Sequence, residues 1–128
     1  MPEEGFPVQW TGRCAVITLP SEVDTSNGDQ IRSDLLTAID QGAAPLIVDL
    51  STTTFCDSAG VKAVVSAYRR AVTKGTDIRL VIASPMVRRV FALTEADRLV
   101  LVYTTLAEAS SDLADLGRPS RDGDGAAG

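Results

Sequence analysis

Short apolar runs alternate along the chain with polar or glycine-rich segments. Five of these runs predict β-strands, at residues 7–10, 14–19, 46–50, 78–83 and 99–103. Thr11-Gly12 joins the first two runs and favours an antiparallel hairpin. The second run is apolar on both faces, as expected of a strand inside a sheet.

Other segments repeat their apolar residues at helical spacing. The first helix is predicted to bury Ile31, Leu35, Ala38 and Ile39. The second is predicted to bury Val61, Val64, Val65, Tyr68, Ala71 and Val72. A third helix, over residues 85–94, is predicted to bury Val87, Val90, Phe91 and Leu93. Residues 105–116 predict a fourth, amphipathic helix.

Capping residues indicate where these helices begin and end. Residues 24–26 offer N-capping side chains to the first helix, and Gly42 follows its end. Gly75 closes the second helix. Ser84 and Pro85 favour the start of the third, since a cap followed by proline suits a first helical turn.

The resulting order of elements is β-β-α-β-α-β-α-β-α. Strand–helix–strand units require right-handed crossovers and a largely parallel sheet, to which the opening hairpin adds an antiparallel edge. We therefore predict an α/β fold with a mixed, mostly parallel five-stranded sheet and about four helices. The domain is expected to span residues 6–116, and the polar, glycine-rich residues 117–128 to form a disordered tail.

Composition and charge narrow the classes of function. The 128 residues are 45% apolar, enough for one compact core, and carry a formal net charge of −5. Nucleic acid is not an expected partner, because no basic stripe is present to neutralise a phosphate backbone. No apolar run approaches the roughly 20 residues that cross a membrane, and the acidic opening does not look like a leader peptide. We expect a cytoplasmic protein, with a monomer as the default.

Histidine is absent, which removes Ser–His and Cys–His nucleophile pairs and imidazole metal sites. Cys14 and Cys56 lie far apart without a CxxC pattern, so buried free thiols are expected. No clustered acidic motif indicates a metal ion or paired-carboxylate catalysis. We expect neither a cofactor nor enzymatic activity.

The segment around Ser58 carries the most informative chemistry. The buried strand 46–50 leads through a Ser/Thr loop to Asp57-Ser58, where the second helix opens. A hydroxyl there lies beside unpaired N–H groups and the positive end of a helix dipole, an environment that suits a phosphate. Because the carboxyl ends of parallel strands share one edge of a sheet, Asp24, which follows the second strand, is expected near Ser58.

Simpler structural roles are open for the same side chains. Asp57 and Ser58 fit a helix N-cap, and Asp24 suits a cap of the first helix as well as it suits contact with a partner. The three threonines at 52–54 are expected to supply loop hydrogen bonds.

Three segments of the chain are similar to those of one known family. The most specific runs from Asp49-Leu50-Ser51 to Phe55-Cys56-Asp57-Ser58-Ala59-Gly60, and the supporting ones are Glu22-Val23-Asp24 and Ser84-Pro85-Met86-Val87-Arg88-Arg89-Val90-Phe91. Across residues 6–116 the chain resembles the STAS-domain anti-sigma factor antagonists of bacterial partner-switching systems.

The resemblance implies a phosphorylation switch. Family members are phosphorylated on the first serine of the Asp-Ser-Ala/Ser-Gly motif, which falls on Ser58 here. The kinase is the anti-sigma factor itself, using ATP. The unphosphorylated antagonist binds this kinase and frees a sigma factor, and a phosphatase resets the phosphorylated form. The resemblance implies a partner-binding site formed by Asp24, Asp57, Ser58, Ala59 and Gly60.

Two short segments depart from the family pattern. Pro20-Ser21 stands where the family often has glycine before the Glu-x-Asp turn, and Asn27-Gly28 stands where Thr-Ala commonly opens the first helix. Both departures bear on partner contacts near Asp24 rather than on the phosphate acceptor.

Three other functions fit parts of the pattern. A phosphorelay receiver with Asp49 as acceptor suits the length and alternation, but the chain lacks an acidic pair for Mg²⁺ and a lysine after the last strand. A nucleotide-binding module would need a glycine-rich phosphate loop, which is absent. A non-switching STAS scaffold of a larger signalling assembly is the third, and self-association into large particles would identify it.

Overall fold

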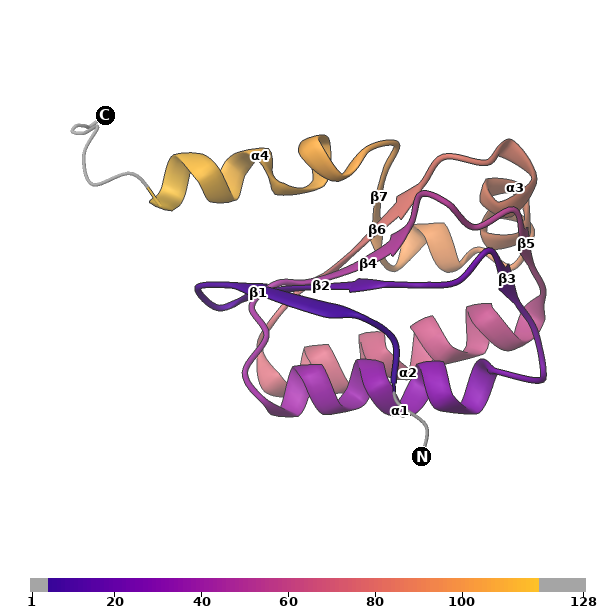
Figure 1. The fold of residues 1–128 in the computed structure, drawn as a ribbon, viewed down its shortest axis with the longest axis horizontal. Coiled ribbons are helices and arrows are strands. Elements are labelled where there is room, and N and C mark those ends of the chain that lie inside the picture. The colour runs from indigo at the N-terminus through magenta and orange to yellow at the C-terminus, as the bar shows by residue number, and fades with distance from the viewer. Residues whose placement is uncertain (1–4, 118–128) are drawn as a thin grey trace.

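The computed structural model describes residues 5–117 and has the predicted α/β fold (Figure 1). Its main sheet has the strand order β1-β2-β4-β6-β7. These strands are β1 (Val8–Thr11), β2 (Cys14–Thr18), β4 (Leu46–Leu50), β6 (Ile78–Ile82) and β7 (Leu101–Tyr103). β1 pairs antiparallel with β2 and the other pairs are parallel, which confirms the predicted hairpin edge and mixed five-stranded sheet.

The helices form layers on both faces of this sheet. Within residues 5–117 they are α1 (Gly28–Asp40), α2 (Ser58–Lys74), α3 (Pro85–Leu93) and α4 (Leu106–Gly117), with a 3-10 turn, η1 (Ala96–Arg98), before β7. In Figure 1, α1 and α2 lie side by side below the sheet, α4 lies above it, and α3 lies at one end. Leu99 caps the end of η1 and Val100 lies in a bend, so β7 begins at residue 101 instead of the predicted 99.

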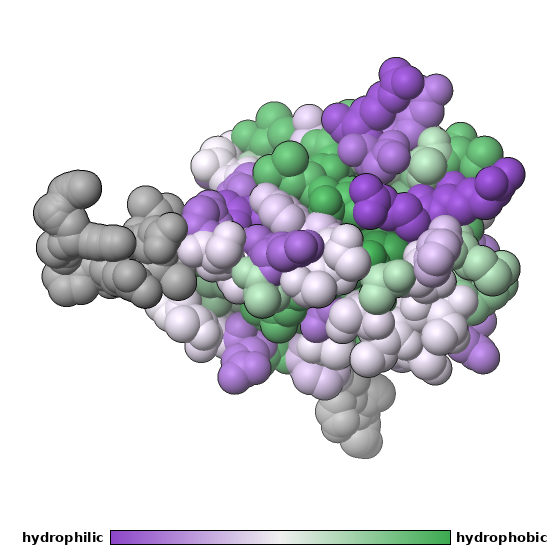
Figure 2. Space-filling model, turned by 90° about the horizontal axis from the view of Figure 1, so that it is seen from above, coloured by the Kyte–Doolittle hydropathy of each residue, from purple (hydrophilic) through white to green (hydrophobic). Residues whose placement is uncertain are grey.

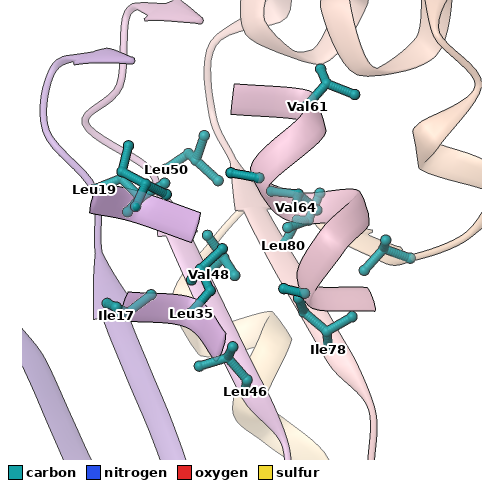
Figure 3. Packing of buried hydrophobic residues seen from close by; sticks show 14 of the residues in the cluster. Ile17, Leu19, Leu35, Leu46, Val48, Leu50, Val61, Val64, Ile78 and Leu80 are labelled. Carbon is teal, nitrogen blue, oxygen red and sulfur yellow. The ribbon is translucent and has the colours of Figure 1, made fainter. Parts of the chain in front are cut away.

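The larger core lies between the sheet and the α1–α2 layer (Figure 3). Alternate residues of β2 face it, while β4 and β6 are buried along their whole length because they are central strands covered on both faces. Labelled members of this core are Ile17, Leu19, Leu35, Leu46, Val48, Leu50, Val61, Val64, Ile78 and Leu80.

Local capping explains where α2 and α3 begin. The Asp57 carboxylate accepts a hydrogen bond from the N–H of Ala59 at 2.9 Å, and the Ser84 hydroxyl accepts one from the N–H of Val87 at 3.3 Å. Gly75 ends α2 in the left-handed conformation, with φ 73°. These three predicted helix boundaries are confirmed.

Two residues predicted to be buried are exposed instead. Val72 is 59% exposed and Leu93 is 70% exposed. Leu93 lies about 200° around α3 from the buried Phe91, so it points away from the core. Val72 lies about 100° past the buried Ala71, near the end of α2, which turns it toward solvent.

The α4 side of the sheet carries a smaller core and a buried arginine. Ile47, Val81 and Ala109 are buried here. Arg79, on β6, is 7% exposed and donates to the two Asp112 oxygens at 2.7 and 3.0 Å and to the Ala109 carbonyl at 2.8 Å. Figure 2 looks onto this side and shows hydrophobic surface between charged side chains. The arginine therefore attaches α4 to the sheet.

Arg79→Met should loosen α4 more than any other part of the domain. Methionine keeps the apolar stem of the side chain but loses the charged hydrogen bonds, including the one to the Ala109 carbonyl. The free energy of unfolding in urea should fall by about 2 kcal/mol. Hydrogen exchange should accelerate in α4 before it does in α1 or α2. Arg70→Met is the matched control, because Arg70 pairs with Asp40 at the surface and should change stability little. Equal effects of the two substitutions would contradict this role for Arg79.

The remaining expectations concern membranes and the C-terminal tail. No helix within residues 5–117 combines the length and hydrophobicity needed to cross a membrane. Gly117, expected in the tail, is the last residue of α4. The expected disorder of residues 118–128 lies outside the described residues.

Candidate functional site

Two short strands that no local sequence pattern predicts bring distant loops together. β3 (Glu22–Val23) and β5 (Phe55–Cys56) pair in parallel as a separate small sheet. Val23 lies opposite Cys56, and the Val23 carbonyl accepts a hydrogen bond from the N–H of Asp57 at 3.1 Å. Asp24 and Asp57 each follow directly after these paired strands. The structure thus places Asp24 and the start of α2 at the same end of the domain.

The loop that leads to Ser58 is held by backbone carbonyls. The hydroxyl of Thr53 donates to the Pro20 carbonyl at 2.8 Å, and the N–H of Thr54 donates to the Ser21 carbonyl at 2.8 Å. The expected loop hydrogen bonds are confirmed for Thr53 and Thr54. Pro20 and Ser21, which depart from the family pattern, support this loop through their main chain.

Ser58 is the first residue of α2, and its side chain is exposed. Asp57 occupies the N-cap position in an extended conformation, and its carboxylate bonds the N–H of Ala59. Asp57 is therefore the residue that caps α2. Ser58 follows as an exposed residue at the first helical position.

Ala59 and Gly60 allow α2 to approach its neighbours closely. A Cβ on the buried Gly60 would collide with the sulfur of Cys56 and lie 2.7 Å from Cγ1 of Val23. A Cβ on Gly28, at the start of α1, would lie 3.1 Å from the Cβ of Ala59. The small residues of the motif thus set the position of Ser58 against β3, β5 and α1. The family departure at Gly28 belongs to the same close contact.

Asp24 does not cap α1, contrary to one of the two roles considered for it. Its carboxylate accepts hydrogen bonds from the N–H of Ser26 at 2.9 Å and from the Ser26 hydroxyl at 2.5 Å, which lowers the pKa of Asp24. Residues 24–26 fold into a turn of their own, and Asn27 takes the N-cap position without a capping hydrogen bond. Asp24 therefore stays ionised in a loop beside the start of α2.

The Asp49 side chain is committed to the backbone. It is 8% exposed, and its carboxylate accepts a hydrogen bond from the N–H of Ser51 at 2.9 Å. This geometry suits a carboxylate that shapes the following loop better than a phosphate acceptor. Among the described residues, no three His, Cys, Asp or Glu side chains group closely enough to hold a metal ion.

Both cysteines are free thiols, as predicted. Cys56 is buried beneath the site; burial, and secondarily the negative charge of Asp57, raises its pKa to about 11. Cys14 is half-buried rather than buried, and its pKa is also raised by burial. The Cys56 thiol therefore stays protonated at neutral pH and packs as an apolar side chain.

Exposed apolar residues also lie at this end of the domain and were missed from the sequence. Phe55 on β5 is 49% exposed, and Met86 in the first turn of α3 is 74% exposed. Figure 1 shows α3 next to β5. β5 is only two residues long, so no local pattern pointed to this exposure; Phe55 faces outward because its neighbour Cys56 is buried and successive strand residues point to opposite faces.

Comparison with known proteins relates the chain to one family. A model of the STAS domain family matches residues 6–109. The anti-sigma factor antagonist SpoIIAA in its unphosphorylated form is 29% identical, with a TM-score of 0.74 over 89% of this chain and 100% of that chain. The Bacillus cell fate determinant SpoIIAA in its phosphorylated form is 30% identical, with a TM-score of 0.66 over 85% and 99%. An anti-sigma factor antagonist (STAS) domain protein from Planctomyces limnophilus, 24% identical with a TM-score of 0.76 over 88% and 99%, shares the fold.

Proposed function

Since the chain belongs to the STAS domain family, we propose that it is an anti-sigma factor antagonist controlled by phosphorylation of Ser58. The observation that carries this proposal is the exposure of Ser58 at the first position of α2. SpoIIAA, the relative at 29–30% identity, is an anti-sigma factor antagonist with both unphosphorylated and phosphorylated forms. The chain would act by binding, as a kinase substrate without enzymatic activity of its own.

In this proposal the end of the domain that carries unphosphorylated Ser58 docks onto an anti-sigma factor serine kinase. Asp24, Asp57 and Ser58 offer polar contacts, and the exposed ring of Phe55 adds apolar area. Gly60 is buried, so it would support the site from below rather than touch the partner. Binding would release a sigma factor that the kinase otherwise holds.

Phosphorylation would reverse this docking by charge. A phosphate adds about −1.5 to −2 charge and three acceptor oxygens. These would lie next to the carboxylate of Asp57 and at the same end of the domain as Asp24. Burying this cluster against a partner would require desolvation and like-charge contact. The phosphoprotein would stay folded, lose its partner and await a phosphatase. The proposed protein is a cytoplasmic monomer in both states.

The direct test is to incubate the chain with its candidate anti-sigma kinase and ATP and to locate phosphate by mass spectrometry. We expect one phosphate, on Ser58, and none in Ser58→Ala. Phosphate only on Ser51 or on residues 52–54 would overturn the site assignment. Lack of any phosphate, together with self-association into large particles, would favour the scaffold function instead.

A further inference from the structure

A basic side chain lies one helical turn beyond Ser58 on the exposed surface of α2. Lys62 follows Ser58 by four residues and is exposed. Residues four apart lie on one face of a helix, and helical side chains lean toward the N-terminus. The Lys62 ammonium can therefore reach the turn that begins with Ser58.

Lys62 also lines a groove between α1 and α2, whose N-terminal ends lie together (Figure 1). The groove has a volume of about 290 Å³ and is lined by Thr25, Gly28, Asp29, Arg32, Ala59, Lys62 and Ala63. Neither Lys62 nor Arg32 forms an ion pair with any side chain of residues 5–113. Two cations without a partner in this part of the chain thus share a groove beside the modifiable hydroxyl.

We propose that Lys62 forms an ion pair with the phosphate of modified Ser58 and holds it against α2. This inference deepens the proposed function and rests on Ser58 being the modified residue. An anion four residues N-terminal to a lysine is the favourable orientation of such a pair on a helix.

The charged groups around this phosphate act in opposite directions. Asp57, Asp24 and, across the groove, Asp29 repel it, whereas Lys62 and Arg32 attract it. Only Lys62 combines the positive charge with a position one turn away on the same helix. The pair should therefore favour the dianion and lower the second pKa of the phosphoserine.

The test is a ³¹P NMR titration of the full chain with phosphoserine incorporated at residue 58 during translation. We expect a second phosphate pKa about 0.3 units lower than in the Lys62→Gln variant, roughly a twofold change in the proton dissociation constant. Arg69→Gln is the matched control, since it removes the same charge farther along α2, about 16 Å from residue 58 and beyond the Debye length.

Identical titrations of the parent chain and Lys62→Gln would overturn the ion pair, as would an equal shift in Arg69→Gln. Because Lys62 and Arg69 are both exposed, neither substitution is expected to unfold the domain. The incorporated phosphoserine needs no kinase, so the titration stays readable if Ser58 proves not to be a kinase substrate. Conversely, failure of the ion pair would leave the proposed switch at Ser58 intact.

Discussion

Ser58→Glu should bind the anti-sigma factor at least about 100-fold more weakly than the parent chain, because docking would desolvate a new carboxylate close to those of Asp57 and Asp24. The structure makes this a test of charge, since the Ser58 side chain is exposed and the helix is capped by Asp57. Isothermal titration or surface plasmon resonance against the candidate partner measures the loss. Circular dichroism should show an unchanged fold.

Two controls separate charge at the site from charge in general. Ser58→Ala keeps a small neutral side chain and should bind persistently even with ATP present, because the kinase has no hydroxyl to modify. Ser111→Glu adds the same charge on exposed α4, on the opposite face of the sheet, and should leave the affinity unchanged. Equal weakening by Ser111→Glu and Ser58→Glu, or full binding by Ser58→Glu, would rule out the docking surface at Ser58.

Gly60→Ala should destabilise the domain by about 2–3 kcal/mol. The added methyl group would collide with the buried Cys56 sulfur and meet Val23 at 2.7 Å, so α2 has to move away from β3 and β5. The sign of the stability change is informative, because replacing an unhindered glycine inside a helix by alanine stabilises a protein by about 1 kcal/mol. Urea unfolding measures the difference.

A double-mutant cycle tests the cause of this loss. Cys56→Ala removes the sulfur that the new methyl group would meet, so Gly60→Ala should cost less in that background. Additive effects of the two substitutions would place the strain elsewhere. A stabilised Gly60→Ala variant would contradict the close packing of α2 altogether.

The main elements could be predicted because their signals are local. A run such as 46–50 is apolar throughout and becomes a strand buried on both faces, and Ser84 followed by proline starts a helix with a bonded cap. Gly75 stops α2 for a reason confined to one residue, its left-handed backbone. Such features need only neighbours in the chain.

Contacts between residues that are far apart in the chain could not be predicted in the same way. β3 and β5 are two residues each, too short for any alternation to be visible, yet their pairing brings Val23 to Cys56 and sets where α2 begins. Aspartate is a common helix-capping residue, so Asp24 was a candidate cap for α1. In the structure, Ser26 binds its carboxylate and α1 starts later. Competing hydrogen bonds of similar energy decide such cases.

The sequence by itself determined the alternation of strands and helices, the capped start of α2 and a hydroxyl at that start, because backbone propensity and capping act over a few residues. Only the tertiary structure decided that Ser58 faces solvent, that Gly60 lies against Cys56, and that Arg79 reaches Asp112. Those outcomes depend on contacts between residues far apart in the chain. They are set when the layers pack.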